Sequence, residues 1–350
     1  MKHTRTSCKL ISIILCLALT LPIAGCGETV ENKSTVFAMD TNMTLIAYGN
    51  NGQKGLRAAE SIVLSLDAAL DPDNENGIVY KMNHAQGQST VVSGQIADML
   101  STAQTVYSRS KGALDLTIYP LVKRWGFADS NYYVPTDEEI ASDLERLCFD
   151  QLVLTPFPSS GSYSVIMPEY AEITFAAAAR GCASANAVEA MRQAGVTSGV
   201  VSMSGNVQTL GRKPNGSNWS VAITDPNAPS TYFGVVSVGE TAIVTSGAYQ
   251  RNFVNKADGK FYHHILKPSS GYPVSGVLSS VTVICEDGIM ADCLSTALYI
   301  MGESAALNYW RTHGGFEMVL VTTDNRVVCT SGLIEQFTLT SDNYTLKFSE

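Results

Sequence analysis

The stretch MADCLSTALYIM, residues Met290–Met301, decides the fold class, because it predicts a helix within a region of strands. A second helix is predicted at Cys182–Ala194, and the rest of the chain beyond Tyr163 has the pattern of strands and turns. Helices that interrupt strands without a regular βαβ alternation predict an α+β fold. No linker divides the chain after residue 35. We therefore expect a single compact domain over residues 36–350.

The first part of this domain is predicted to begin with a strand and to continue with helices. Residues Val36–Tyr48 alternate around Met43, Leu45 and Ala47, which predicts one strand. Apolar residues at helical spacing predict two helices, and a polar loop follows the first of them. The expected helices are Leu56–Leu70 and Ile96–Lys111, the loop is Asp71–Gly77, and further strands are expected at Gly199–Met203 and Thr241–Val244.

Residues 1–25 are expected to be a lipoprotein signal peptide. Three basic residues precede an apolar run over residues 10–21, which is shorter than the ~20 residues of a membrane span. The run leads to Leu21-Pro22-Ile23-Ala24-Gly25-Cys26, which resembles a bacterial lipobox; an ordinary signal peptide that contains a cysteine is the alternative. We expect lipid on Cys26, a polar tether over residues 26–35, and a protein anchored on the extracytoplasmic face of the cell membrane.

Charge and cysteine content exclude several kinds of function. The chain has a formal net charge of −9, and loss of residues 1–25, which hold three basic and no acidic residues, would make it −12. An acidic chain argues against nucleic-acid binding, because phosphate recognition needs a basic face. Beyond Cys26, the cysteines have no CxxC spacing and support neither a disulfide framework nor a zinc site. We expect them to be buried as small apolar residues.

Asp292 and Thr296 are four residues apart in the predicted helix Met290–Met301 and so share one of its faces. Their carboxylate and hydroxyl can supply two hard oxygen ligands to Mg²⁺. The alternative is structural, with Asp292 as the N-cap of the helix and Thr296 packed against a neighbouring turn. From these residues alone, the structural interpretation is the better supported one.

His263 and His264 are adjacent in the segment FYHHILKPSSGYP, Phe261–Pro273, which ends in a predicted turn. Neighbouring residues on a strand point to opposite faces, so at most one of the two histidines can face a given site. A histidine near a metal can act as general base toward a hydroxyl or hydrogen-bond a substrate. Beside a turn it can equally well satisfy backbone groups.

Two further segments contain turns that could approach a ligand. In TSGAYQR, Thr245–Arg251, the backbone donors of a small-residue turn can approach a phosphate, and Arg251 can pair with charge. The segment GALDLT, Gly112–Thr117, predicts a turn into a packed aromatic segment. Neither is specific by itself, and the chain has no P-loop, HExxH or GxSxG motif.

Together and in this order, these segments resemble one family, the ApbE-type FAD:protein FMN transferases, once called thiamine-biosynthesis lipoproteins. The resemblance begins at Met39-Asp40-Thr41, where the family usually has Met-Gly-Thr, and it covers nearly the whole mature chain. It implies an ApbE-like, T-fold-like α+β domain of largely antiparallel sheets with packed helices. The other matching segments are Asn83, Gly112–Phe127, Val188-Glu189 with Gly195-Val196, Trp219 with Asp225-Pro226, Thr245–Arg251, His264 and Ala291–Thr296.

The resemblance implies an activity and a set of site residues. The family binds FAD and Mg²⁺ and moves FMN onto a Ser or Thr hydroxyl of an acceptor protein, a membrane redox subunit or an FMN-binding domain, with release of AMP. By position, Asp292, Thr296 and the main-chain carbonyl of Ala177 would bind the metal, and His264 would be catalytic. The positions that match the flavin site are Met39, Asn83, Ala113, Leu114, Asp115, Thr174, Arg180, Ser246, Gly247, His264 and Ile265.

The chain departs from the family pattern in this flavin site. The usual Asp-Leu-Gly-Gly-Ile-Ala-Lys-Gly is TFAAAARG here, Thr174–Gly181, so a carboxylate becomes Thr174 and a lysine becomes Arg180. Alanines replace glycines at 176 and 177, which costs about 1 kcal/mol or more if the backbone there needs φ > 0. Charged groups also change at Asn206, Lys267 and Ser269.

We therefore expect Mg²⁺-dependent FMN transfer and keep two alternatives. One is a catalytically weakened, flavin-binding or scaffold lipoprotein. The other is a pyrophosphatase that converts FAD to FMN and AMP, with water in place of the acceptor hydroxyl.

Overall fold

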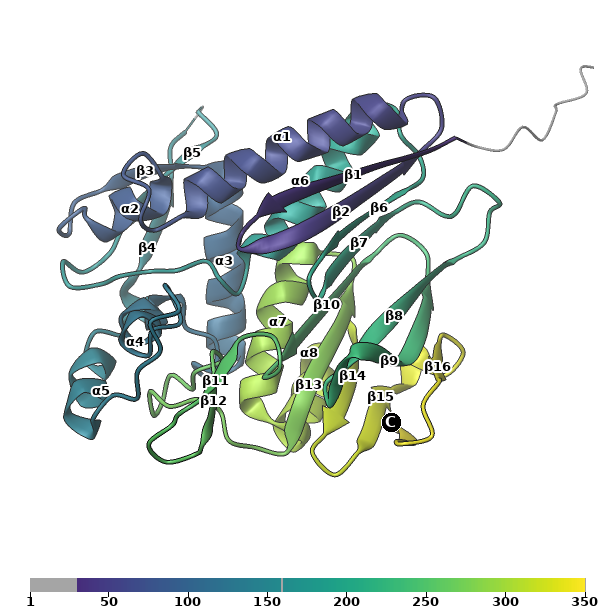
Figure 1. Ribbon diagram of the computed structural model, residues 1–350. Helices are drawn as coiled ribbons and strands as arrows, with labels where there is room; N and C mark the ends of the chain where they lie inside the picture. The colour runs from purple at the N-terminus through teal and green to yellow at the C-terminus, as the bar shows by residue number, and fades with distance from the viewer. Residues whose placement is uncertain (1–29, 159, 350) are drawn as a thin grey trace, which may run out of the picture.

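The computed structural model describes residues 30–158 and 160–349, and its strands form one large sheet and three smaller ones (Figure 1). The strands are β1 (Glu31–Ala38), β2 (Thr41–Tyr48), β3 (Thr90–Ser93), β4 (Val153–Pro156), β5 (Ser162–Ile166), β6 (Gly199–Met203), β7 (Asn206–Leu210), β8 (Trp219–Asp225), β9 (Ala228–Val238), β10 (Ala242–Gly247), β11 (Asn252–Val254), β12 (Phe261–His263), β13 (Leu278–Cys285), β14 (Glu317–Thr322), β15 (Arg326–Thr330), β16 (Phe337–Leu339) and β17 (Thr345–Ser349).

The large sheet has the order β1-β2-β6-β7-β10-β13-β14-β15-β17. Its neighbouring strands are antiparallel except for the parallel pair β15 and β17. The smaller sheets are β16-β9-β8, β3-β5-β4 and the hairpin β11-β12. The strand β10, which is buried along its whole length, lies at the middle of the large sheet.

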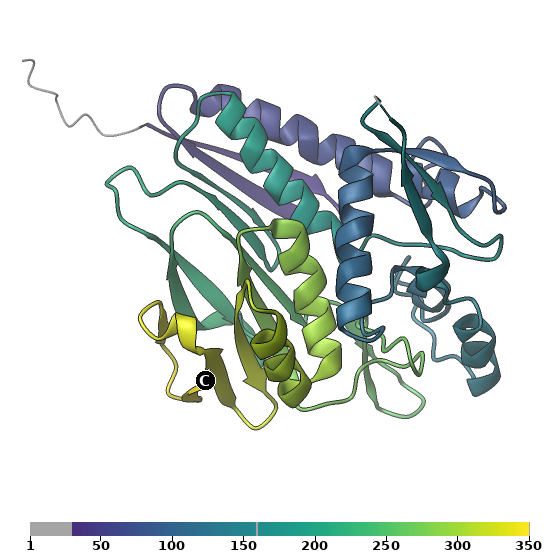
Figure 2. The ribbon, with the colours of Figure 1, turned by 180° about the vertical axis from the view of Figure 1, so that it is seen from behind.

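Helices cover one face of the large sheet, and the β16-β9-β8 sheet covers part of the other (Figures 1 and 2). The α-helices are α1 (Gly52–Leu70), α2 (Ile78–Asn83), α3 (Gly94–Arg109), α4 (Tyr119–Arg124), α5 (Asp137–Leu144), α6 (Ala179–Gln193), α7 (Gly288–Met301) and α8 (Glu303–His313), and 3-10 turns are η1 (Leu116–Ile118), η2 (Phe149–Gln151) and η3 (Ser331–Leu333). In Figure 2, which shows the molecule from behind, α3, α6 and α7 lie side by side in front of the sheet.

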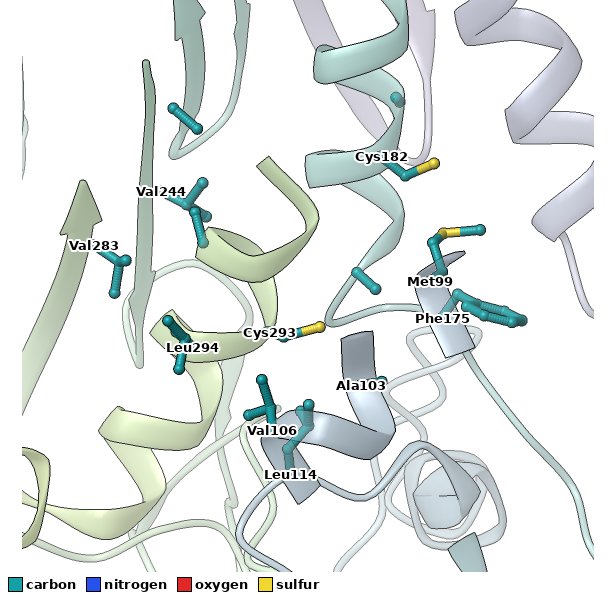
Figure 3. Packing of buried hydrophobic residues seen from close by; sticks show 14 of the residues in the cluster. Met99, Ala103, Val106, Leu114, Phe175, Cys182, Val244, Val283, Cys293 and Leu294 are labelled. Carbon is teal, nitrogen blue, oxygen red and sulfur yellow. The ribbon is translucent and has the colours of Figure 1, made fainter. Parts of the chain in front are cut away.

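The core between the sheet and the helices is continuous and apolar. Cys293 of α7 lies between α6 and α3 in this core, near Ala103 and Val106 (Figure 3). A second cluster fills the space between the large sheet and β16-β9-β8. A third, aromatic cluster joins α4 and α5 to the β11–β12 hairpin through Trp125 and Phe127. These layers fix α6, α7 and β10 relative to one another.

The expected α+β architecture of antiparallel sheets and packed helices is confirmed. The four predicted helices correspond to α1, α3, α6 and α7, and the strand Gly199–Met203 is β6. The cysteines at 148, 182, 285, 293 and 329 are free and buried, as expected. Among the described residues, no helix combines the length and the hydrophobicity needed to cross a bilayer.

Four local predictions are wrong. Beyond Tyr163, α8 is a third helix where only strands and turns were expected. Val36–Tyr48 is not one strand, because Met39 and Asp40 form a two-residue turn between β1 and β2. β1 begins at Glu31, so residues 31–35 belong to the sheet and not to a tether. β10 extends to Gly247, which leaves only residues 248–251 for the turn expected over Thr245–Arg251. The signal peptide and Cys26 lie outside the described residues, and both stay predictions.

Candidate functional site

Helix α6 begins against the first turns of α7, and a glycine permits this approach. A Cβ atom on Gly181 would lie 2.1 Å from the carbonyl oxygen of Gly288 and 2.8 Å from Cβ of Asp292. Any larger residue would push the two helices apart, because backbone atoms cannot rotate away as a flexible side chain can. Gly181 therefore keeps the N-terminus of α6 within hydrogen-bonding distance of α7. Sequence analysis did not identify this role, since the two glycines are distant in the chain.

Asp292 caps α6, not its own helix. The backbone N–H of Gly181 donates to Oδ2 of Asp292 over 2.8 Å, and the N–H of Arg180 also donates to the carboxylate. The structural alternative for Asp292 was wrong in its detail, because Asp287 is the N-cap of α7 and accepts from the first-turn N–H groups. Asp292 is 2% exposed. Burial raises the pKa of its carboxyl, while the Arg180 guanidinium and the two N–H groups oppose this rise.

The hydroxyl of Thr296 lies one turn beyond Asp292, where α7 faces the end of β10. Oγ of Ser246 lies 2.8 Å from Oγ of Ser295 and 3.2 Å from Oγ1 of Thr296. Ala177 lies two residues before α6, close in sequence to the N–H groups that Asp292 caps. The residues predicted to bind a metal thus lie where the start of α6, the middle of α7 and the end of β10 meet.

Arg180, in the first turn of α6, supplies the positive charge of this region. Its guanidinium favours the ionised forms of Asp292 and Tyr249 and disfavours the protonated form of His264. In the part of the chain that the structure describes, the Arg180 side chain has no salt bridge. A planar guanidinium without an ion-pair partner, near a single carboxylate, is suited to bind a phosphate.

His264 is neutral, and its tautomer is fixed. Nδ1 lies 3.1 Å from the carbonyl oxygen of Arg251, so Nδ1 carries the proton and donates it, and Nε2 keeps its lone pair. Burial, followed by the charge of Arg180, lowers the pKa of His264 to about 3. His263 has a structural role, because its Nε2 donates to the carbonyl oxygen of Val274 over 2.9 Å. The two rings therefore differ in role, although only His263 belongs to a strand, because β12 ends there.

Arg251 connects His264 to two other segments. Its carbonyl oxygen accepts from both the backbone N–H and Nδ1 of His264. Its guanidinium donates to the carbonyl oxygen of Phe127 over 2.9 Å and forms an ion pair with Asp40 at 3.3 Å. Asp40 and Met39 have φ values of 57° and 50°, as a type I′ hairpin turn requires. Arg251 thus pairs with charge, as its sequence context allowed, and its partner is Asp40 of the same chain.

Asn83 positions the segment that leads into α6. Its amide donates to the carbonyl oxygen of Ile173 over 3.1 Å and accepts from the N–H of Ile173 over 2.7 Å. One residue further, Oγ1 of Thr174 accepts from the N–H of Ala176 over 3.3 Å. Ala176 and Ala177 are not among the described residues with positive φ, so replacement of the family's glycines introduces no left-handed strain.

The segment Ala113–Asp115, predicted to line the flavin site, lies where the chain leaves α3 for η1. Asp115 caps η1 by accepting from the N–H and the hydroxyl of Thr117, over 2.7 and 2.6 Å. Burial raises the pKa of its carboxyl. Leu114 and Ile265 are buried in the core, whereas Ala113 is only half-buried. Of these residues, only Ala113 keeps substantial accessible surface.

Gly247 ends β10 beneath an aromatic ring that sequence analysis did not single out. A Cβ atom on Gly247 would lie 2.6 Å from Cε1 of Tyr249. Burial raises the pKa of Tyr249. The glycine thus lets Tyr249 pack against the strand next to Ser246.

The profile of the ApbE family matches residues 39–320 of this chain. The chain belongs to the ApbE family. A curated relative from Haemophilus influenzae, named FAD:protein FMN transferase, is 26% identical over 337 residues, which are 92% of this chain and 96% of the relative. The relative of the same name from Treponema pallidum is 24% identical and covers 98% of this chain and 99% of its own length.

Solved structures of ApbE proteins have the same fold. The flavinyl transferase ApbE of Pseudomonas stutzeri, in its apo form, matches with a TM-score of 0.77 at 25% identity, over 89% of this chain and 98% of that protein. The ApbE protein of Thermotoga maritima matches with a TM-score of 0.75 at 25% identity, over 84% of this chain and 94% of its own. The ApbE resemblance inferred from the ordered segments is thereby confirmed.

Proposed function

We propose that this ApbE protein is an FAD:protein FMN transferase. In this reaction an acceptor hydroxyl oxygen forms a bond to the phosphorus of the FMN half, the pyrophosphate bond breaks, and AMP leaves. The observation that carries the proposal is that the charge of Arg180, a cation without a salt bridge in the described residues, acts on both the buried carboxylate of Asp292 and the neutral ring of His264. A reaction between a pyrophosphate and a hydroxyl uses groups of these three kinds, namely a carboxylate, a cation and a neutral imidazole.

The residues of the site fit a magnesium ion. Mg²⁺ prefers six oxygen ligands and is usually held by one or two carboxylates together with water and phosphate oxygens. Asp292 supplies one carboxylate, which forms no salt bridge within the described ranges, and Thr296 and the Ala177 carbonyl would add two neutral oxygens. Among residues 30–158 and 160–349, no group of three or more His, Cys, Asp or Glu side chains is present to bind a metal. When bound, the cation would neutralise charge on the pyrophosphate.

The side chains around this position have separable tasks. Arg180 can donate two parallel hydrogen bonds to a phosphate and so orient it. His264 has its Nε2 lone pair free of the hydrogen bond to Arg251, and that nitrogen can accept a hydrogen bond from the acceptor hydroxyl and orient it. Asn83 holds the segment before α6 through both backbone groups of Ile173 and thereby helps to position Arg180.

The departures from the family pattern at residues 174, 176, 177 and 180 leave this arrangement intact. Arg180 retains the positive charge of the usual lysine, and the alanines at 176 and 177 adopt their conformation without positive φ. Thr174 replaces a carboxylate but keeps a local hydrogen bond to the N–H of Ala176. These observations favour an active enzyme over a scaffold that has lost catalysis.

The lipobox-like segment that ends at Cys26 supports a proposal about where in the cell this activity takes place. We propose that the protein is anchored by lipid on the extracytoplasmic face of the cell membrane, where acceptors such as membrane redox subunits or FMN-binding domains would lie. Mass spectrometry of the N-terminal peptide, with Cys26→Ser as control, tests this part. An unmodified thiol at Cys26 would contradict it.

Transfer is tested with the full chain in detergent, FAD, Mg²⁺ and a purified FMN-binding domain. We expect flavin fluorescence that stays with the acceptor through denaturing electrophoresis, and equimolar AMP. Asp292→Asn should abolish both products, whereas Asp342→Asn, at an exposed carboxylate, should leave them unchanged.

The other outcomes distinguish the alternatives. AMP and free FMN without a labelled acceptor would identify a pyrophosphatase. FAD binding without any product would identify a flavin-binding scaffold.

A further inference from the structure

A cleft of about 880 Å³ opens beside the candidate site and contains none of the residues predicted to bind flavin. Its walls come from the β8–β9 turn, the β12 strand, the loop over residues 272–279 and the start of the turn after β10. We propose that this cleft binds an extended, uncharged or acidic segment of the acceptor protein and delivers its Ser or Thr hydroxyl to the site. This inference rests on the proposed transferase function and names the partner's binding surface.

The floor of the cleft lies next to the proposed metal ligands. Tyr299 lines the cleft and lies three residues, about one helical turn, beyond Thr296 on α7. Tyr249 lines it too and lies two residues after Gly247, with Ala248 between them. A hydroxyl that enters over these tyrosines would arrive beside the end of β10.

The two adjacent histidines separate the cleft from the residues predicted to bind flavin. His263 lines the cleft and packs edge-on against Tyr299, with ring centroids 5.9 Å apart, whereas His264 does not line it. Met39, Asn83 and Ala113, expected on the flavin side, are likewise absent from its walls. A transferase must bring two substrates, here FAD and the acceptor protein, to one site. The cleft and the residues predicted to bind flavin provide two separate routes to that site.

One wall of the cleft presents free backbone donors. Residues Ser275 and Gly276, which line the cleft, are exposed and lie outside any strand. Within the described residues, their N–H groups donate no hydrogen bond. The wall continues into a bulge at Ser279, between Leu278 and Ser280. Unpaired donors beside a strand end recognise extended peptides through their backbone, largely independently of sequence.

The charge of the residues that line the cleft determines the charge of the acceptor segment that can bind there. Lys260 is the charged residue among the described residues that line it, and no carboxylate lines it, although the chain has a net charge of −9. The neighbouring Asp258 is occupied, because it accepts from the hydroxyl of Tyr262 over 2.8 Å and from the N–H of Lys260 over 3.0 Å. Asp258 also interacts with the charge of Lys260, but it does not line the cleft, so the lining itself favours neutral or acidic partners over basic ones.

The experiment uses two labelled 12-residue peptides, each with one central Thr between small residues, carrying either three Asp or three Lys. Binding to the full chain in detergent is followed by fluorescence anisotropy, and FAD binding by flavin fluorescence. We expect the acidic peptide to bind about tenfold more tightly than the basic one, and Lys260→Glu to reverse this order.

Gly276→Trp blocks the cleft and should weaken binding of the acidic peptide by about tenfold or more, with unchanged affinity for FAD. A side chain at Gly276 meets nothing nearer than 3.9 Å, so the substitution should not disturb the fold. The matched control is Gly239→Trp, at a surface glycine with no atom within 4 Å. It should leave both affinities unchanged.

Three results would overturn the inference: equal peptide binding by wild type and Gly276→Trp, equal binding of the acidic and basic peptides, or loss of FAD affinity in Gly276→Trp. Loss of FAD affinity in Gly276→Trp would show that the cleft binds flavin. Absence of FMN transfer by the wild type, with cleft-dependent peptide binding retained, would refute the proposed function and not the cleft.

Discussion

Gly181→Ala tests whether the contact between α6 and α7 builds the site. The added methyl would lie 2.1 Å from the carbonyl oxygen of Gly288, where ordinary contact begins at 3.4 Å, so the helices must separate by roughly 1 Å. Overpacking of this kind costs about 1–3 kcal/mol. Weakening of the hydrogen bond from Gly181 to Asp292 adds about 1–2 kcal/mol, and the higher helix propensity of alanine returns about 1 kcal/mol. We expect a net loss of about 2–3 kcal/mol in the free energy of unfolding.

Urea denaturation measures this loss. With a slope of about 2–3 kcal/mol/M, the unfolding midpoint should fall by about 1 M. FMN transfer should fall further, by about 100-fold, because a 1 Å displacement of a catalytic group can cost that much. Gly94→Ala is the matched control in α3, since its Cβ would lie 3.5 Å from the nearest atom, and it should unfold at the wild-type midpoint or above it.

The reasoning fails if Gly181→Ala keeps the wild-type midpoint and rate. It also fails if Gly94→Ala loses as much stability, because the effect would then come from any glycine substitution in a helix.

Three further predictions concern side chains of the site. Arg180→Lys should change the KM for FAD less than about tenfold, and Arg180→Gln should raise it by more, because the charge outweighs the fork geometry. Asn83→Ala should lower stability by about 1–3 kcal/mol in urea denaturation and raise the KM for FAD, because both backbone groups of Ile173 lose their partner. The pKa of His264 is about 3 when folded, against 6.5 unfolded, so the unfolded chain binds the proton first and stability falls as pH is lowered from 6.5 towards 3. His264→Gln should flatten that decline, and a ring NMR signal of His264 that titrates between pH 5 and 8 would contradict it.

Much of the fold could be predicted from local patterns, because helical periodicity is a local property. The segment Leu56–Leu70 falls within α1, and Met290–Met301 within α7. The β1–β2 hairpin was missed because its turn, Met39-Asp40, lacks the glycine or asparagine that signals a type I′ turn. The polar residues before Val36 concealed β1, since an edge strand can be exposed on one face.

The site was predictable only in part. The spacing of Asp292 and Thr296 placed them on one face of a helix, and the structure confirms the helix. The partner of Asp292 is Gly181, 111 residues away in the chain, and no local pattern indicates such a contact. Asn83 matched the family pattern, but its bonds to the backbone of Ile173 could be seen only in three dimensions.

The capping of α6 by Asp292 has a consequence for how the protein matures. The carboxylate already has backbone partners from Gly181 and Arg180, so the fold is complete before a cation arrives. This differs from small metal-binding domains that unfold when a chelator removes their ion. The cation of the proposed function would therefore serve catalysis, and the contact between α6 and α7 would persist without it.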